Sequence, residues 1–143
     1  MTAIEGGCHC GNIRWRFTPA RPLAELPARR CTCAFCAKHG AFYTSDPGGR
    51  LSVEIGKADE VGVYRFGTRT TEPQVCRRCG VMPLILAHIE GRVYGVVNLA
   101  TAEDLAIPPE RIQNVNFEHQ TAEERIARRA RTWIAQVSVT SHG

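Results

Sequence analysis

Seven cysteines, gathered into three short groups, constrain this 143-residue chain more than any other feature of its sequence. Disulfides are rare in reducing compartments, and an odd number of cysteines behind a start that lacks a secretory signal argues against a disulfide framework. Tight grouping is typical of metal ligands instead, and thiolates at these spacings favour zinc. The groups are Cys8 and Cys10; Cys31, Cys33 and Cys36; and Cys76 and Cys79.

Each pair of cysteines has the spacing of half a tetrahedral metal site. Cys76 and Cys79 lie three residues apart and are followed by Gly80, so a tight turn can direct both thiolates toward one ion. Cys8 and Cys10 lie two residues apart, which places both on the same side of an extended chain. Two such pairs together would form a closed site, the arrangement typical of structural zinc.

The middle group supplies three thiolates, from Cys31, Cys33 and Cys36. Three protein ligands with an open fourth position are typical of catalytic zinc, where water or a substrate thiol can bind. A thiol bound to the metal has a lowered pKa and is nucleophilic at neutral pH. Four cysteines in one site and three in the other account for all seven, so we expect two zinc ions per chain.

Spacing alone leaves two other arrangements open. Cys8 and Cys10 could share one ion with the first two cysteines of the middle group. His39 follows the middle group by three residues and could close it into a second structural site. Paired carboxylates, a phosphate-binding loop and a nucleophile–base signature are absent from the sequence.

Short alternating stretches predict a mainly β fold. Ile13, Trp15 and Phe17 alternate with polar residues, which is the period-two pattern of a half-buried strand. Glycines and prolines separate several such stretches, as in an all-β core. Further strands are expected at 51–55, 61–66, 82–89 and 92–99, the last two joined by a turn at Glu90 and Gly91.

The tail of the chain predicts one helix, over about 121–137. Thr121 and Glu124 form a capping box, which satisfies the first free backbone amides of a helix. We interpret the arginines of this segment as surface charge on a helix that packs through Trp133. The apolar residues of the expected buried face are Ile126, Ala130, Trp133 and Ile134. The whole chain, 1–143, is thus expected to be a single zinc-binding domain with a β core over about 1–120.

Composition narrows the class of protein. A net charge of +4 with 43% hydrophobic and 22% charged residues is ordinary for a globular domain. Basic and aromatic residues are not interleaved in one patch, which argues against nucleic-acid binding. The sequence also lacks a run of roughly 20 apolar residues that could span a membrane. We therefore expect a cytoplasmic protein, with neither nucleic acid nor membrane as a partner.

In order and spacing, the motifs Cys-x-Cys-Gly, Cys-x-Cys-x-x-Cys and Cys-x-x-Cys-Gly resemble those of the glutathione-dependent formaldehyde-activating enzyme family, which includes centromere protein V-like members. The resemblance extends from about Gly6 to Asn98 and includes the stretch Tyr64–Gly67 ahead of the third group. It implies a mainly β fold of small antiparallel sheets arranged like a tent. It also implies a pairing: the structural zinc is held by Cys8, Cys10, Cys76 and Cys79, and the catalytic zinc by Cys31, Cys33 and Cys36.

The same resemblance implies a function. Members of the family are carbon–sulfur lyases that join formaldehyde and glutathione reversibly into S-hydroxymethylglutathione, with the glutathione sulfur or water as the fourth zinc ligand. Two alternatives are a zinc-stabilised domain that carries a thiol without catalysis and a protein-interaction domain. By charge and proximity in the sequence, Lys38, Arg77 and Arg78 are candidate contacts for the carboxylates of the thiol.

Overall fold

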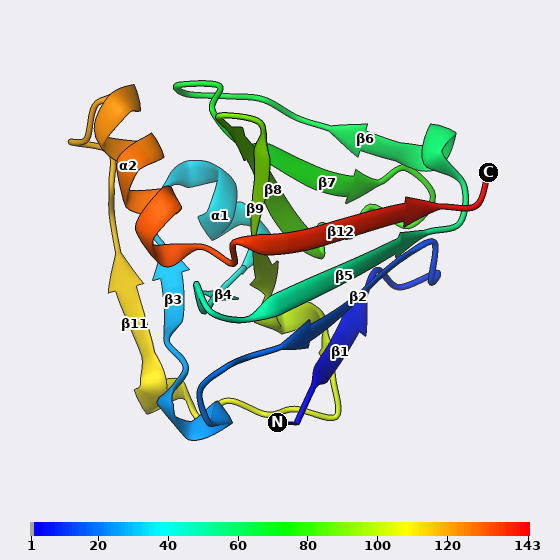
Figure 1. Cartoon of the computed structure of the whole chain (residues 1–143), viewed down its shortest axis with the longest axis horizontal. Coiled ribbons are helices and arrows are strands. Elements are labelled where there is room, and N and C mark those ends of the chain that lie inside the picture. Colours follow the sequence, from blue (N-terminus) through cyan, green and yellow to red (C-terminus); the bar gives the residue numbers. More distant parts are fainter. Residues whose placement is uncertain (1) are drawn as a thin grey trace.

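Two β-sheets form the body of the molecule in the computed structural model, which describes residues 2–143 (Figure 1). In spatial order, the five-stranded sheet contains β10 (Ala102–Glu103), β1 (Ile4–Gly7), β2 (Ile13–Thr18), β5 (Arg50–Ile55) and β12 (Gln136–Ser141). The seven-stranded sheet contains β11 (Ile112–Val115), β3 (Ala28–Cys31), β4 (Tyr43–Thr44), β9 (Arg92–Asn98), β8 (Leu84–Ile89), β7 (Glu72–Cys76) and β6 (Val61–Val63).

Antiparallel pairing prevails in both sheets, so the prediction of a mainly β fold is confirmed. Two pairs are parallel, β11 with β3 and β12 with β5. The α-helices are α1 (Ala34–His39) and α2 (Ala122–Thr132). Short 3-10 turns lie at Leu23–Glu25, Ala58–Glu60, Leu99–Thr101 and Pro109–Arg111. No helix in residues 2–143 has both the length and the apolar character needed to cross a membrane.

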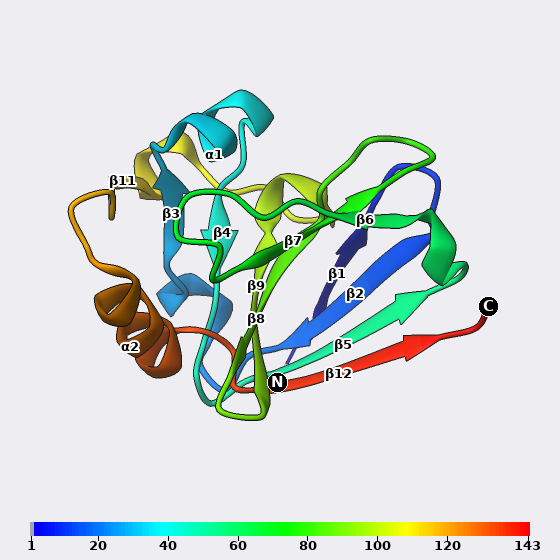
Figure 2. The same cartoon turned by 90° about the horizontal axis from the view of Figure 1, so that it is seen from above.

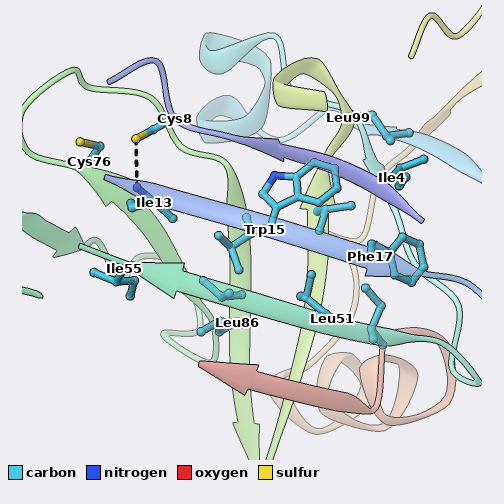
Figure 3. Close-up of a cluster of buried hydrophobic side chains, with 14 of the residues drawn as sticks. Ile4, Cys8, Ile13, Trp15, Phe17, Leu51, Ile55, Cys76, Leu86 and Leu99 are labelled. Carbon is cyan, nitrogen blue, oxygen red and sulfur yellow. Dashed lines mark hydrogen bonds between the residues drawn. The ribbon is translucent and has the colours of Figure 1, made fainter. Parts of the chain in front are cut away.

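The main hydrophobic core lies between the two sheets (Figure 3). Ile13, Trp15 and Phe17 occupy alternate positions of β2 and are all buried, which confirms the period-two pattern in the sequence. They pack in one cluster with Leu86 of the other sheet. The indole nitrogen of Trp15 donates a hydrogen bond to Thr101 Oγ1 at 3.1 Å, so the polar atom of this buried ring has a partner.

Most of the predicted strands form close to their expected bounds, as β2, β5, β8 and β9, with Glu90 and Gly91 in the turn between the last two. The strand predicted over 61–66 is shorter and ends at Val63. The chain turns after this strand through Gly67 and Arg69, both with φ of 58°. A residue with positive φ cannot continue a strand, so the segment leaves the sheet as a loop.

The C-terminal helix begins as predicted but ends earlier. Thr121 and Glu124 form the expected capping box, but α2 stops at Thr132 rather than near 137. Trp133 has extended backbone, and Ile134 is fully buried in an isolated bridge to Gly95. The chain then continues as β12, which adds to the edge of the five-stranded sheet beside β5. The predicted burial is confirmed for Trp133 and Ile134, although helical spacing was the wrong reason for both. Ile126 is half-buried, and the prediction was wrong for Ala130, which is exposed.

We predict that Ile134→Ala lowers the free energy of unfolding by about 2–5 kcal/mol, because it leaves a cavity in the core. Ile134 has 0% exposure, and its backbone exchanges hydrogen bonds of 3.0 and 2.9 Å with Gly95. The matched control is Val139→Ala in β12, where the side chain is 45% exposed and the change should stay within about 0.5 kcal/mol. Urea unfolding of both variants measures the difference. Equal, small effects would show that the segment after α2 does not pack as described.

Candidate metal centres

Four cysteines from both sheets meet at one point. Cys8 follows the last residue of β1, and Cys10 lies in the turn that leads to β2. Cys76 ends β7, and Cys79 lies in the turn after it. Their four Sγ atoms all lie within 4.8 Å of one another. The cluster therefore joins the five-stranded sheet to the seven-stranded sheet.

The sulfur positions in this cluster fit a tetrahedral metal site. Cys10 Sγ lies 3.7 Å from Cys8 Sγ and 3.5 Å from Cys76 Sγ. Four sulfurs at about 2.3 Å from one zinc ion would lie roughly 3.8 Å apart, whereas a disulfide bond needs about 2.05 Å. The cysteines are free thiols. The cluster could hold a metal ion, with the set of donors that zinc prefers in structural sites.

Local backbone geometry holds these thiols in place. The amide of Ile13 donates a hydrogen bond to Cys8 Sγ at 3.2 Å, drawn as the dashed line in Figure 3. Gly11 and Gly80 follow the two cysteine pairs with φ of 86° and 81°, a conformation that other residues rarely adopt. Burial raises the pKa of the Cys8 thiol to about 12. Burial also acts to raise the pKa of Cys79, but hydrogen bonds from backbone amides outweigh it and lower that pKa to about 6.

The other three cysteines gather around the start of α1. Cys31 ends β3, Cys33 is the N-cap of α1, and Cys36 lies within the helix. Cys33 Sγ accepts a hydrogen bond from the backbone amide of Cys36 at 3.5 Å. The three Sγ atoms lie within 4.8 Å of one another. This group, which we call the triad, could also hold a metal ion, through three thiolates.

The geometry also decides between the arrangements that spacing left open. The cluster of four combines the first and third cysteine groups and includes no member of the triad. His39 stays outside both clusters, and its ring packs against Phe35 with the two centroids 4.6 Å apart. Within residues 2–143, no fourth cysteine, histidine or carboxylate joins the triad. Three protein ligands with room for one more are typical of a reactive rather than a structural metal site.

Hydrogen bonds within the triad give its thiols different proton affinities. A hydrogen bond from Cys36 lowers the pKa of Cys31 to about 6, and the same contact, together with burial, raises the pKa of Cys36. Tyr43 Oη lies 3.3 Å from Cys36 Sγ. Burial raises the pKa of Tyr43, so its hydroxyl keeps its proton and can donate to the sulfur. Tyr43 thereby fixes the position of one thiol of the triad.

The triad lies in the wall of a cavity of about 140 Å³. Apolar side chains from several elements form much of the remaining wall: Phe66, Ile85, Val96 and Trp133. A single water needs roughly 10–15 Å³ by the same measure, so the cavity has room for a small organic molecule. Figures 1 and 2 both place α1 and α2 on the same side of the molecule, beside β3 and β11.

Four arginines also line this cavity. Arg29 comes from β3, and Arg125, Arg128 and Arg129 come from α2. Our interpretation of the arginines on this helix as surface charge is wrong for Arg129, which is only 7% exposed. Their spacing in the sequence could have indicated this shared location. Arg125, Arg128 and Arg129 lie three and four residues apart, and residues at these spacings share one face of a helix.

The side chains on α2 give the cavity a positive wall. Burial, followed by repulsion from neighbouring arginines, lowers the pKa of Arg128 and of Arg129 to about 10. Both guanidinium groups therefore remain charged at pH 7, in a site partly removed from water.

The basic residues proposed from sequence proximity lie elsewhere. Lys38, Arg77 and Arg78 do not line the cavity. Arg77 donates to the backbone oxygen of Asp59 at 3.3 Å, and Arg78 forms an ion pair of 3.3 Å with Glu60. Two of the three are thus engaged beside the four-cysteine cluster, because they lie between its ligands in the chain.

Comparisons with known proteins find a matching family, a related sequence and a similar fold. The model of a family described as glutathione-dependent formaldehyde-activating enzyme matches residues 3–119. A protein of Halomonas elongata, provisionally named as such an enzyme, is 27% identical over 116 residues, which cover 76% of this chain and 72% of the relative. A crystal structure of a Rhodobacter sphaeroides protein superposes with a TM-score of 0.58 and 30% identity, over 78% of this chain and 99% of that one.

We predict that the protein binds two zinc ions and that the two sites differ in what they stabilise. Cys33→Ser keeps an oxygen that can cap α1 but removes a thiolate, so it should lose one ion with little change in stability. Cys10→Ser should also lose one ion, but it should cost several kcal/mol of unfolding free energy because that site joins the sheets. Cys10 is exposed, so lost packing would not explain such a cost.

Native mass spectrometry gives the metal count, and urea unfolding gives the stability. Retention of two ions by Cys33→Ser would contradict the assignment of the triad as a metal site. Equal destabilisation by the two variants would contradict the division into a structural and a reactive site.

Proposed function

This chain belongs to the glutathione-dependent formaldehyde-activating enzyme family, and from that premise we propose that it is a zinc-dependent carbon–sulfur lyase. Its substrates would be a small thiol such as glutathione and a small aldehyde such as formaldehyde. The observation that carries the proposal is the contrast between the two cysteine clusters. One has four thiols and is complete, while the other has three thiols and lies in the wall of a cavity.

The two clusters would have separate roles. A structural zinc would be held by Cys8, Cys10, Cys76 and Cys79, and a catalytic zinc by Cys31, Cys33 and Cys36. When bound to the triad, zinc would supply Lewis acidity that lowers the pKa of a thiol in the cavity, so that its thiolate forms at neutral pH. The hydrogen bonds made by Cys36 to Tyr43 and to Cys33 hold the triad in position before a substrate arrives.

The reaction is an addition to a carbonyl group and needs no oxidant or reductant. The thiol loses its proton, the sulfur forms a bond to the carbonyl carbon, and the carbonyl oxygen takes up a proton as the π bond breaks. In the reverse direction the carbon–sulfur bond breaks and the thiol regains its proton. The apolar side chains of Phe66, Val96 and Trp133 in the cavity wall would limit the access of water that competes for the aldehyde.

The proposed substrates indicate where the reaction takes place. A thiol substrate and thiol ligands must both stay reduced, which favours the cytoplasm. Neither a nucleic acid nor a membrane is needed as a partner in this proposal.

We predict that the zinc-loaded protein accelerates the exchange between formaldehyde, glutathione and their adduct by at least about tenfold over the uncatalysed rate. Exchange NMR measures this rate directly, and the spontaneous reaction is the baseline because the adduct also forms without a protein. Cys33→Ala should return the rate to that baseline. Lys38→Ala is the matched control, since this residue belongs to the same helix but does not line the cavity.

The alternative outcomes separate the competing functions. A rate at the baseline for the wild-type protein, with glutathione still bound, would contradict lyase activity and favour a thiol carrier. Acceleration that survives Cys33→Ala would contradict the role of the triad.

A further inference from the structure

The four arginines of the cavity have no acidic partner. Among residues 2–143, none of the ion pairs involves Arg29, Arg125, Arg128 or Arg129. Glu118 is the acidic residue in the cavity wall, but it is exposed and pairs with none of them. Four positive charges thus face one small space in which no carboxylate pairs with them, and the negative charge that the protein itself supplies there is the Cys31 thiolate.

Each guanidinium group also has donors to spare. A guanidinium group carries five N–H donors, and each of these side chains makes a single hydrogen bond to the described part of the chain. The acceptors are all uncharged: Ser45 Oγ for Arg29, the Gln120 backbone oxygen for Arg125 at 3.2 Å, Gln120 Oε1 for Arg128 at 3.0 Å, and Thr70 Oγ1 for Arg129 at 2.6 Å. The spare donors favour a ligand with several acceptor oxygens.

Arg129 provides the strongest evidence. Its side chain is 7% exposed, and its Nε atom is buried without a hydrogen-bond partner in residues 2–143. A buried charge with an unsatisfied donor costs several kcal/mol unless a counter-charge compensates it. The ring of Trp133 lies 5.4 Å from its guanidinium carbon, but an aromatic face offsets only part of such a cost.

Neighbouring residues hold the other arginines in place for a ligand. The guanidinium carbon of Arg128 lies 3.5 Å from the centre of the Phe117 ring. Arg29 donates to Ser45 Oγ, which in turn donates to the backbone oxygen of Thr132 at 2.7 Å, at the end of α2. These contacts connect β3 to α2, so the charges from both elements meet across the cavity.

Most of this positive wall lies outside the segment that the family model matches. The family model matches residues 3–119, and α2 begins at Ala122. The triad lies inside the matched segment, and three of the four arginines lie outside it.

We propose that Arg29, Arg125, Arg128 and Arg129 form an oxyanion site that binds a carboxylate of the substrate while its sulfur lies at the triad. The inference rests on the proposed function, since it takes the triad as the place where the thiol binds. The substrate class is then acidic thiols, and neutral thiols of the same size bind poorly. The α2 arginines determine this specificity.

The test uses a probe that cannot bind through sulfur. The probe is the N-acetylated glutathione analogue in which a methyl group replaces the thiol, and its dimethyl ester is the uncharged counterpart. With the zinc-loaded protein, isothermal titration should show that the acid binds at least about tenfold more tightly than the ester. Arg128→Gln and Arg129→Gln should each remove most of this preference. Arg131→Gln makes the same change of charge at an exposed position of α2 outside the cavity, and it should leave the preference within about twofold.

Each outcome decides the proposal. Equal binding of acid and ester by the wild-type protein would overturn it, as would an equal effect of the Arg131 and Arg128 variants. Tighter binding of inorganic phosphate than of the acid would assign the site to a phosphoryl group and overturn the carboxylate assignment. Arg128 is only partly buried, so its variant keeps the test valid if Arg129→Gln fails to fold. The probe involves no aldehyde and no turnover, so the proposed function can fail while this preference stands.

Discussion

The meeting of two distant turns at the four-cysteine cluster is the constraint on which the rest of the structure depends. One turn belongs to the five-stranded sheet and the other to the seven-stranded sheet, and Cys8 and Cys76 are both buried beside the core that the sheets enclose. Burial of Cys8 favours its neutral thiol, while backbone amides favour the thiolate of Cys79. A divalent ion shared by these sulfurs would remove that conflict, because it stabilises every thiolate at once. The packing of the two sheets thus brings the four sulfurs together, and an ion bound by them would in turn hold the sheets together.

The same ligand chemistry has a different consequence at the triad. The four-cysteine cluster uses two turns, one from each sheet, which together would surround an ion completely. The triad uses the end of one strand and the first residues of a short helix, which are adjacent in the chain and would hold an ion through three ligands. The cavity lies next to the triad. The number of elements that converge on a cluster, rather than the type of ligand, thus decides whether an ion there could react.

The grouping of neighbouring cysteines and the positions of most strands could be predicted from the sequence because both depend on local spacing. The alternation at Ile13, Trp15 and Phe17 and the pairing of neighbouring cysteines are properties of short segments. The end of α2 was mispredicted, since Trp133 and Ile134 fit a helical face equally well; the contact of Ile134 with Gly95, far away in the chain, decides their conformation. The role of the α2 arginines could not be predicted for the same reason. Only the tertiary fold shows that their helix faces the triad.

The C-terminal segment connects these observations. Ile134 is anchored to the seven-stranded sheet, and the strand that follows it pairs with the five-stranded sheet. These two attachments fix the end of α2, and the hydrogen bond from Ser45 to Thr132 fixes its last turn. A helix held in this way can keep arginines without carboxylate partners beside the triad, because moving them into water would require breaking a buried contact. The stability of the sheets therefore maintains the positive wall of the cavity, and a change in this tail could alter the choice of substrate while the metal ligands stay the same.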